Sequence, residues 1–521
     1  MERSASEDAA GCTCVAEWFR RRAGRSPERP ALTFAKHTWS YGEMQRRIEK
    51  MSELLVSGGT SAGDRVAYIG LNHAEVLVAF FATARIGAIF VPLNYRLAPE
   101  ELVTIVRDAT PHTLIADEKH VSVMEPLRDE LSCERYLCLG SAPMGWKTLD
   151  TTMLEEHQSS PSTAARPNDV VLLLYTSGTT GKPKGVMISN GNIWASSIAL
   201  ILGNELNSRD VTLNCAPLFH AAGLCSISLP TLIVGAHLIL QQGFNAGEYL
   251  LALERYRVTH SVLVPAMMLS ISQQEGFETA DLSTLRLLST GGAPVAERLL
   301  TAYSTRGIPV SQSYGLTEST SAVTVLETNY STTKLGSCGR AGVMVDIRLK
   351  DGQGHVITQP YVIGEIFLRG PSITMGYWNR PLKTAESFDE EGWLRTGDGA
   401  HCDADGFYYI GDRIIDMIIT GGENVYPAEV ENILCEHATI TEVAIIGGPD
   451  ERWGERIIAI AALKAGASLS LEELNAFAQN RLARYKLPRE LYIVEALPRT
   501  GSGKIIKSEL RHQFCSQPIS G

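Results

Sequence analysis

The stretch that decides the fold is residues 172–190, LLLYTSGTTGKPKGVMISN. Its apolar start predicts a buried strand, and small, hydroxyl-bearing and basic residues follow directly. Gly178, Gly181 and Gly185 would let backbone N–H groups approach a polyphosphate closely, and the nearby hydroxyls and lysines add donors and positive charge. The segment therefore predicts a phosphate-binding loop at the end of a strand.

This loop differs from a Walker A motif. Gly178 and Gly181 are separated by two residues instead of four, and Pro183 rather than Ser or Thr follows Lys182. A flexible surface hairpin is the plain alternative, because loops rich in Gly, Ser and Thr are common. The pattern of the surrounding chain helps to decide between the two.

Strand and helix patterns alternate on both sides of the loop. Before it, apolar runs at 65–70, 88–93 and 113–116 alternate with helical spacing at 73–85 and 99–108. After the loop, a second alternating block covers residues 211–309. Such alternation predicts parallel sheets that are buried on both faces and bind ligands beyond the carboxyl ends of their strands.

The later part of the chain has a different texture. Over residues 336–409 the helical pattern disappears and short β-type runs lie between turns, and a compact α+β pattern follows residue 413. Residues 158–168, with several Ser and Pro, predict a linker within the first domain. Because 521 residues exceed the size of one hydrophobic core, we expect more than one domain.

Composition limits the partners and the compartment. A net charge of −11 argues against nucleic acid as a partner, and ten scattered cysteines suggest reduced thiols and a cytoplasmic location. The acidic start MERSASEDAAGC is unlike a signal peptide, and the apolar runs are shorter than the roughly 18 residues of a membrane span. A basic cluster beside Trp18 and Phe19 could make weak peripheral membrane contact, with a solvated helix face as the alternative; it consists of Arg20, Arg21, Arg22 and Arg25.

Four further motifs follow the loop in a fixed order. They are YGLTE at 314–318, TGD at 396–398, GDR at 411–413 and PRTGSGK at 498–504. Together with residues 175–185 they resemble the signatures of the adenylate-forming superfamily, and most of all its fatty-acyl and aryl acyl-CoA synthetases. The resemblance spans nearly the whole chain.

The resemblance implies both a fold and a reaction. The fold is α/β, with a large N-terminal domain (1–412) of two doubly wound subdomains plus a small β-barrel subdomain, and a mobile small α+β C-terminal domain (413–521). The implied reaction is ATP- and Mg²⁺-dependent: a hydrophobic fatty or aromatic acid becomes an acyl-adenylate with release of pyrophosphate. A domain rotation then permits acyl transfer to coenzyme A.

The resemblance also assigns residues to the nucleotide. The ATP phosphates would be bound by the loop residues, namely Thr176, Ser177, Gly178, Thr179, Thr180 and Lys184. The base and the acyl carboxylate would lie along two further segments, namely Gly292, Ala293, Pro294, Ser313, Tyr314 and Gly315. Asp398 and Arg413 would bind the ribose. Without their motifs, Lys184 would be a surface lysine and Asp398 an ordinary turn residue.

Four residues are implied to be catalytic. Glu318 would hold Mg²⁺ against the phosphates, since a hard cation prefers oxygen ligands, and Thr317 would contact the α-phosphate. Lys504, on a Gly-rich loop, would reach the carboxylate and α-phosphate, and Lys507 is its nearest competitor. His220 would gate the acyl channel. The alternatives are a helix start for Glu318 and a buried core histidine for His220.

The sequence identifies the acceptor of the acyl group less clearly than it identifies the adenylation step. Gly422, Glu423 and Trp453 match the pantetheine tunnel of acyl-CoA synthetases, which favours CoA. An amide-forming relative that uses an amine is the runner-up, and a non-catalytic acyl- or nucleotide-binding protein is a third class. Ile415 stands where relatives have a polar hinge residue, which puts the hinge dynamics in question. A homodimer is compatible with the sequence.

Overall fold

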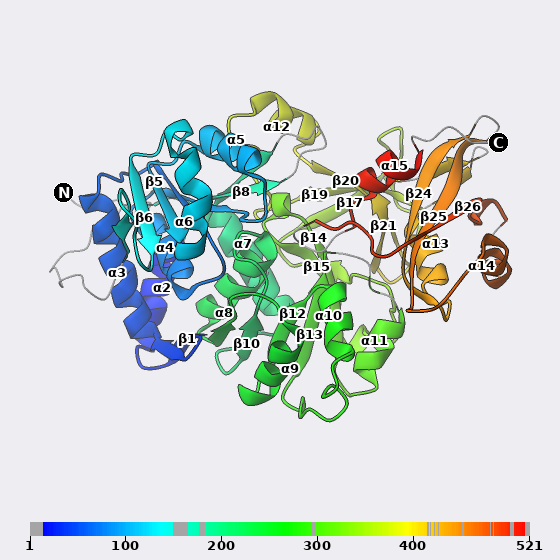
Figure 1. Ribbon diagram of the computed structural model, residues 1–521, viewed down its shortest axis with the longest axis horizontal. Coiled ribbons are helices and arrows are strands. Elements are labelled where there is room, and N and C mark those ends of the chain that lie inside the picture. The colour runs from blue at the N-terminus through cyan, green and yellow to red at the C-terminus, as the bar shows by residue number, and fades with distance from the viewer. Residues whose placement is uncertain are drawn as a thin grey trace.

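The computed structural model describes residues 14–149, 165–176, 183–292, 295, 297–413, 416, 418–420, 423–425, 427–450, 453–479, 481–482, 484–500 and 505–515, with the backbone alone at 412–413, 419 and 423–424. Four sheets organise these residues. In Figure 1 the blue and cyan elements lie on the left, the green elements in the middle and below, and the orange C-terminal elements on the right.

The first sheet has seven strands in the order β7-β6-β5-β3-β4-β8-β9, all parallel except the β8–β9 pair. Its strands are β3 (Arg65–Ile69), β4 (Ile89–Leu93), β5 (Thr113–Asp117), β6 (Arg135–Leu139), β7 (Lys147–Thr148), β8 (Val170–Thr176) and β9 (Lys184–Ser189). The accompanying helices are α3 (Tyr41–Ser57), α4 (Ala74–Arg85), α5 (Pro99–Ala109) and α6 (Glu118–Met124). The strand and helix alternation predicted for residues 65–116 is confirmed.

The second sheet has nine strands in the order β16-β15-β14-β13-β12-β10-β11-β1-β2, with a parallel centre. Its strands are β1 (Pro30–Phe34), β2 (His37–Ser40), β10 (Val211–Asn214), β11 (His237–Leu240), β12 (His260–Leu263), β13 (Leu287–Gly291), β14 (Val310–Gly315), β15 (Ala322–Val325) and β16 (Arg340–Ala341). Its helices are α2 (Val15–Arg25), α7 (Asn190–Gly203), α8 (Leu229–Val234), α9 (Ala246–Arg255), α10 (Pro265–Ser272) and α11 (Glu297–Ser304).

One continuous core joins these two sheets. Helix α4 has the sequence AEVLVAFFATAR, which is apolar on all sides, and Leu77, Phe80 and Phe81 are fully buried. A helix of this kind can only be stable inside the protein. Its core cluster also contains side chains from strands of both sheets, such as Phe90 and Leu238. The two α/β subdomains therefore form a single packed unit.

The β subdomain predicted for residues 336–409 is a five-stranded antiparallel sheet, ordered β18-β17-β19-β20-β21. Its strands are β17 (Asp346–Lys350), β18 (Val356–Ile357), β19 (Gly364–Arg369), β20 (Leu394–Cys402) and β21 (Tyr408–Arg413), and helix α12 (Pro381–Ser387) lies beside it. Within the described residues the end strands β18 and β21 do not pair, so the sheet is open where a closed barrel is expected. Strand β18 has only two residues, and both pair with β17.

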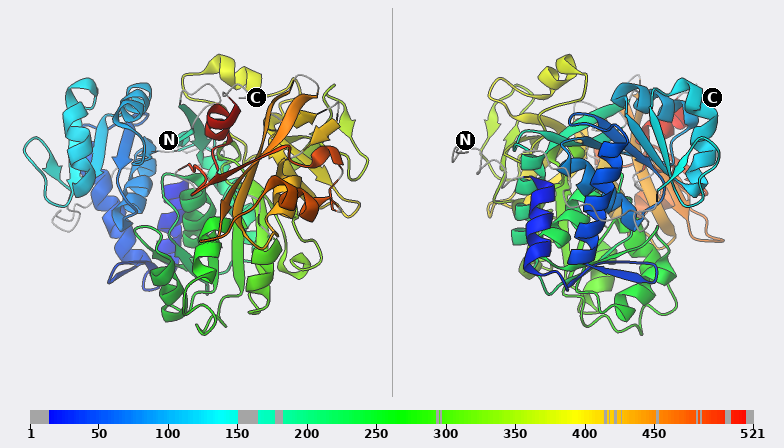
Figure 2. Two further views of the ribbon diagram at one scale, coloured as in Figure 1. Left: turned by 45° about the vertical axis from the view of Figure 1, so that its right-hand side comes forward. Right: turned by 90° about the vertical axis from the view of Figure 1, so that its left-hand side faces the viewer.

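A separate sheet begins after β21. It contains β22 (Ile418–Thr420), β23 (Glu423–Val425), β24 (Ile440–Asp450), β25 (Gly454–Leu463) and β26 (Glu490–Val494). Its helices are α13 (Pro427–Leu434), α14 (Leu471–Ala478) and α15 (Lys507–Cys515). Figure 2 shows this small α+β unit coming forward when the molecule is turned. The predicted architecture, a large N-terminal α/β domain and a small C-terminal domain, is confirmed.

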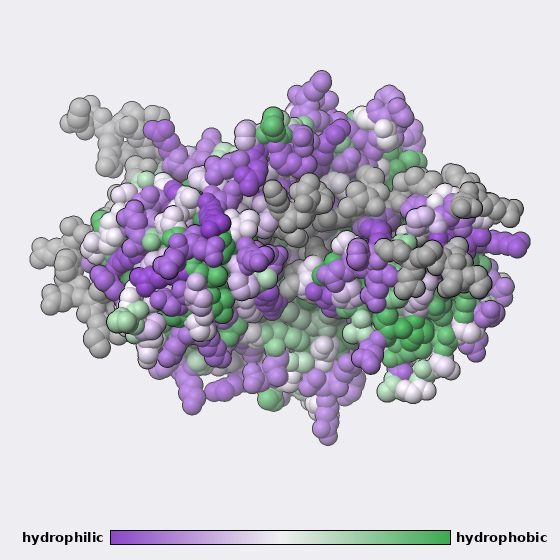
Figure 3. Space-filling view, turned by 45° about the horizontal axis from the view of Figure 1, so that its top comes forward, coloured by the Kyte–Doolittle hydropathy of each residue, from purple (hydrophilic) through white to green (hydrophobic). Residues whose placement is uncertain are grey.

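One face of the molecule is mainly hydrophilic (Figure 3), and none of the described helices is both long and strongly apolar. Hydrophilic residues cover most of the face shown in Figure 3, and hydrophobic residues gather there in smaller patches. No helix in the described part of the chain is long and apolar enough to cross a membrane.

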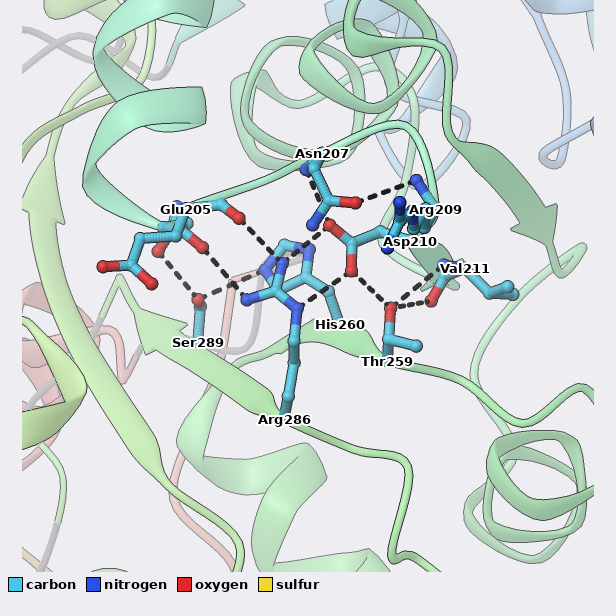
Figure 4. Close-up of polar contacts among 10 residues, drawn as sticks. Glu205, Asn207, Arg209, Asp210, Val211, Thr259, His260, Arg286 and Ser289 are labelled. Carbon is cyan, nitrogen blue, oxygen red and sulfur yellow. Dashed lines mark hydrogen bonds and ion pairs between the residues drawn. The ribbon is translucent and has the colours of Figure 1, made fainter.

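A buried polar cluster lies at the amino ends of the central strands of the second sheet (Figure 4). Arg286 binds the Asp210 carboxylate through two hydrogen bonds of 2.9 and 2.6 Å, and Thr259 donates a third of 2.8 Å. Burial tends to raise the pKa of Asp210, but these hydrogen bonds outweigh it and lower the pKa. Behind them His260 is fully buried, and its Nε2 lies 3.3 Å from the Ser289 hydroxyl.

We predict that His260 makes stability fall as the pH is lowered. Burial, reinforced by Arg286, lowers its pKa from 6.5 to about 4. The unfolded state therefore binds more protons between these values, and the stabilisation, on the order of 3 kcal/mol, is full above pH 6.5 and is lost as the pH falls towards 4. Denaturant unfolding across this range should show a shallower pH slope in His260→Gln. The same substitution at the exposed His355 should keep the parental slope, and a parental slope in His260→Gln would contradict the prediction.

Candidate active site

The predicted phosphate loop connects a hairpin of the first sheet. Strands β8 and β9 pair antiparallel, and Thr176 is the register partner of Lys184 at the end where the loop joins them. Strand β8 is buried from Val171 to Leu174, as the apolar run predicts. Ser177, Gly178, Thr179 and Thr180 lie outside the described residues. Thr176 and Lys184 therefore mark the two ends of the loop.

The second strand of this hairpin is held by a distant segment, residues 374–378. The Met187 N–H donates to the Gly376 carbonyl at 3.0 Å, and the Trp378 N–H donates to the Gly185 carbonyl at 2.8 Å. The Thr374 hydroxyl adds a bond of 2.6 Å to the Met187 carbonyl. These bonds attach the segment along β9, so the strand that follows the loop is fixed to it.

The same segment reaches Glu318. Thr317 and Glu318 lie in a 3₁₀ turn, Thr317–Ser319, directly after β14. The Thr374 N–H donates to the Glu318 carbonyl oxygen at 2.8 Å. The Tyr377 hydroxyl donates to Glu318 Oε1 at 2.8 Å, and Lys184 Nζ lies 4.5 Å from the centre of the Tyr377 ring. The structure thus brings the predicted phosphate lysine and the predicted metal ligand to one tyrosine.

Backbone strain follows immediately after Glu318. Thr320 has φ of +68°, which is unfavourable for a β-branched residue. Its buried hydroxyl donates to the Ser372 carbonyl at 2.7 Å, so the neighbouring segment stabilises the conformation. Strain of this kind is concentrated at functional sites.

The nucleotide segments lie at the carboxyl ends of β13 and β14. These strands are parallel, with Gly291 paired to Ser313, so Gly292 and Gly315 emerge at one edge of the sheet. Gly292 has φ of +80°, and a Cβ on Gly315 would lie 2.2 Å from the Ser321 carbonyl oxygen. Only glycine fits at position 315 without displacing the backbone. Ala293 and Pro294 lie outside the described residues.

Tyr314 and Asp398 are in direct contact. The Tyr314 hydroxyl donates to Asp398 Oδ2 at 2.7 Å, and burial together with the Asp398 charge raises the tyrosine's pKa well above its usual value. Asp398 is also the register partner of Arg413 in the β20–β21 ladder. The side chain of Arg413 is outside the described part. Three predicted nucleotide positions therefore converge between the second sheet and the β subdomain.

His220 lies between β10 and α8 in the second α/β subdomain. It precedes a π-helical turn, Ala222–Ser228, and its ring packs 4.5 Å from that of Phe219. Tyr95 contacts Phe219 edge-on at 5.3 Å. Single π-helical turns are rare and occur often at functional sites. The ring of Phe219 therefore packs against both His220 and Tyr95.

The predicted residues of the C-terminal domain are described only in part. Trp453 follows β24, and its ring lies 4.9 Å from the Arg489 guanidinium carbon. Glu423 begins β23, where only the backbone is described. Gly422, Ile415 and Lys504 lie outside the described residues. Lys507 lies 2.9 Å from the Glu431 carboxylate, so its ammonium group has an anionic partner within its own domain.

Glu318 is also suited to the metal that the resemblance implies. Among the residues that the structure describes, no group of three or more His, Cys, Asp and Glu side chains could hold a metal ion. Tyr377 occupies one carboxylate oxygen of Glu318. A single protein carboxylate fits Mg²⁺, which usually takes its other ligands from phosphates and water.

Comparison with known proteins agrees with this geometry. The family model of AMP-binding enzymes matches residues 19–378, and that of the AMP-binding enzyme C-terminal domain matches residues 429–504. The chain is 40% identical over 500 residues to a feruloyl-CoA synthase of Amycolatopsis sp. (96% of this chain, 99% of the relative). It is 36% identical over 498 residues to an indoleacetate–CoA ligase of Aromatoleum aromaticum (95% and 97%).

A solved structure is similar over nearly the whole chain as well. The anthranilate CoA ligase AuaEII in complex with anthranoyl-AMP superposes with a TM-score of 0.89 at 25% identity, covering 96% of each chain. Sequence and structure therefore lead to one assignment. The chain belongs to the AMP-binding enzyme family and is an AMP-forming acid–CoA ligase.

Proposed function

We propose that this ligase activates an aromatic carboxylic acid with ATP and Mg²⁺ and transfers the acyl group to CoA. The observation that carries the proposal is the meeting of Lys184 and Glu318 at Tyr377, beside the sheet edge that bears Gly292 and Gly315. This arrangement places a cation and a carboxylate beside backbone that is bare of side chains. A polyphosphate needs those features together.

The chemistry proceeds in two displacements. The acid carboxylate attacks the α-phosphorus of ATP and pyrophosphate leaves; the CoA thiol then attacks the acyl carbon and AMP leaves. We assign phosphate binding to Thr176, Ser177, Gly178, Thr179, Thr180 and Lys184, with Thr317 at the α-phosphate. Glu318 would hold Mg²⁺, which supplies neutralisation of phosphate charge. Lys504 would neutralise the charge that develops during the first displacement.

The remaining assignments belong to the same proposal. Asp398 and Arg413, opposite each other in one ladder, would bind the ribose, and Tyr314 would lie against the base. The second displacement would use Gly422, Glu423 and Trp453 at the pantetheine. In this proposal the N-terminal domain is 1–412 and the C-terminal domain 413–521, which puts the boundary at the end of β21 (Tyr408–Arg413), the last strand of the β subdomain sheet before β22 of the C-terminal sheet.

The aromatic substrate class rests on two supports. The two relatives are described as ligases of ferulate and indoleacetate, and the solved structure as a ligase of anthranilate; all three acids carry a ring. In this chain, Phe219 and Tyr95 cluster beside His220, the proposed gate of the acyl channel. Aromatic rings pack well against such faces. We therefore favour aromatic over straight-chain fatty acids.

The proposal also covers the compartment, the membrane contact and the oligomeric state of the enzyme. The nine cysteines in the described part of the chain are all free, which fits a reducing compartment such as the cytoplasm. Arg20 and Arg21 both bind Glu17, and Arg22 donates to the Ile233 carbonyl, so this helix face gives little support for membrane contact. A homodimer remains compatible with the chain.

A panel of acids tests the substrate class. We expect kcat/KM for CoA-dependent AMP formation to be at least about tenfold higher with indoleacetate, ferulate or anthranilate than with octanoate or palmitate, because pocket shape distinguishes acids by on the order of 1–3 kcal/mol. Coupled detection of AMP and mass analysis of the thioester would measure this. A preference for the straight-chain acids would overturn the aromatic assignment.

A further inference from the structure

Tyr377 lies outside the five sequence motifs, yet it touches two proposed active-site groups. Its hydroxyl donates to Glu318 Oε1 at 2.8 Å, and Lys184 Nζ lies 4.5 Å from its ring centre. The residue itself is 6% exposed. One buried side chain therefore contacts both the proposed metal ligand and the proposed phosphate lysine, through two different parts of its structure.

The hydroxyl can act only as a donor towards Glu318. An ionised carboxylate has no proton to give and can only accept, so in this 2.8 Å bond the phenol O–H is the donor. A carboxylate that accepts this bond on Oε1 is fixed in its rotation and keeps Oε2 for another ligand. Bonds of this kind to a metal ligand commonly orient it for the metal.

The backbone around Tyr377 is fixed as well. Its N–H donates to the Thr384 hydroxyl at 2.9 Å, and the Trp378 N–H donates to the Gly185 carbonyl at 2.8 Å. At the other end of the segment, the Thr374 N–H donates to the Glu318 carbonyl at 2.8 Å. The segment thus ties the strand of Lys184 to the turn of Glu318, and Tyr377 stands between the two ties.

We propose that Tyr377 is a positioning residue that couples the two halves of the ATP site. Its hydroxyl orients the Glu318 carboxylate for Mg²⁺, and its ring holds the Lys184 ammonium beside the polyphosphate by a cation–π contact. The inference rests on the proposed roles of Glu318 and Lys184. It predicts that the hydroxyl contributes to the binding of magnesium-bound ATP alone. The ring should contribute to the binding of ATP both with and without the metal.

Two substitutions separate these contributions. Tyr377→Phe keeps the ring and removes the hydroxyl, so calorimetric titration should show binding of magnesium-ATP weakened by about tenfold, while binding of ATP in excess EDTA is unchanged. Tyr377→Leu removes the ring as well, and should weaken binding in both conditions. In a Glu318→Gln background, Tyr377→Phe should cause little further loss, because its partner for metal binding is already gone.

Tyr303→Phe is the matched control. Tyr303 is buried and its hydroxyl donates to the Met268 carbonyl at 2.8 Å, within the core of the second subdomain. This variant should bind both forms of ATP as the parent does. Equal weakening of magnesium-bound and metal-free ATP by Tyr377→Phe, or no weakening of either, would overturn the inference. A parent protein that binds no ATP would instead overturn the proposed function.

Discussion

Lys504→Ala is expected to slow acid-dependent pyrophosphate release by a factor of about 100 or more, while transfer to CoA from supplied acyl-adenylate continues near the parental rate. The reason is that a single preorganised cation stabilises charge that develops only in the first displacement. Once the adenylate has formed, that charge has left with pyrophosphate. Separate assays of the two half-reactions, with aromatic acid plus ATP and with synthetic acyl-adenylate plus CoA, measure the difference.

Lys507 offers the control for this experiment. Its ammonium group lies 2.9 Å from the Glu431 carboxylate, so it is engaged within the C-terminal domain. Lys507→Ala should therefore keep adenylation within a few-fold of the parent, with any loss traceable to stability. Equal loss of both half-reactions in Lys504→Ala would show a structural role. Loss of adenylation in Lys507→Ala alone would move the assignment to that residue.

Ile415→Pro is expected to abolish acyl transfer and leave pyrophosphate release largely intact. Strand β21 ends at Arg413 in the sheet of the β subdomain, and β22 begins at Ile418 in the C-terminal sheet, so we expect a torsional hinge in the few residues between. Proline fixes φ near −65° and would hold one orientation of the small domain. The same two half-reaction assays detect the selective loss.

Ile415→Lys completes this test. It introduces the polar residue type that the resemblance implies at the hinge and should change either half-reaction little. Nearby, Arg511 of α15 binds the Asp416 carboxylate at 2.5 Å, so a rotation of the domain has to carry this ion pair with it or break it. If Ile415→Pro transfers acyl groups at the parental rate, the chain does not hinge at this position.

The local sequence pattern is sufficient to predict much of the fold. The uninterrupted apolar face of α4 predicts a buried helix, and the strand and helix alternation around it predicts a parallel sheet. Helix α14 ends at Ala478 although the helical spacing continues to residue 482. Element ends of this kind depend on tertiary packing, which periodicity does not contain. The open order of the β subdomain sheet, likewise, depends on pairings between distant strands.

In the candidate site, too, local motifs predict some residues, whereas others become apparent only through tertiary contacts. Glu318 and Lys184 stand in recognisable motifs, and the resemblance assigns Asp398 and Arg413 to one ribose, in agreement with their pairing in the β20–β21 ladder. Tyr377 was missed because it lies in a loop after Gly376, where no period or spacing singles it out. Its importance comes from contacts with β9 and with the turn of Glu318, both far away in sequence. The only signal was a pair of aromatic residues in a loop, Tyr377 and Trp378, which is weak by itself.

The acceptor of the acyl group is the most direct test of the whole account. An amide-forming enzyme would share the adenylation site and differ only in what attacks the adenylate. The measurement is mass analysis of the products formed from ATP, Mg²⁺ and one aromatic acid when CoA and a panel of amines are offered together. The account predicts the aryl-CoA thioester as the main product, with AMP and pyrophosphate. Amide without thioester, for every aromatic acid tried, would contradict it.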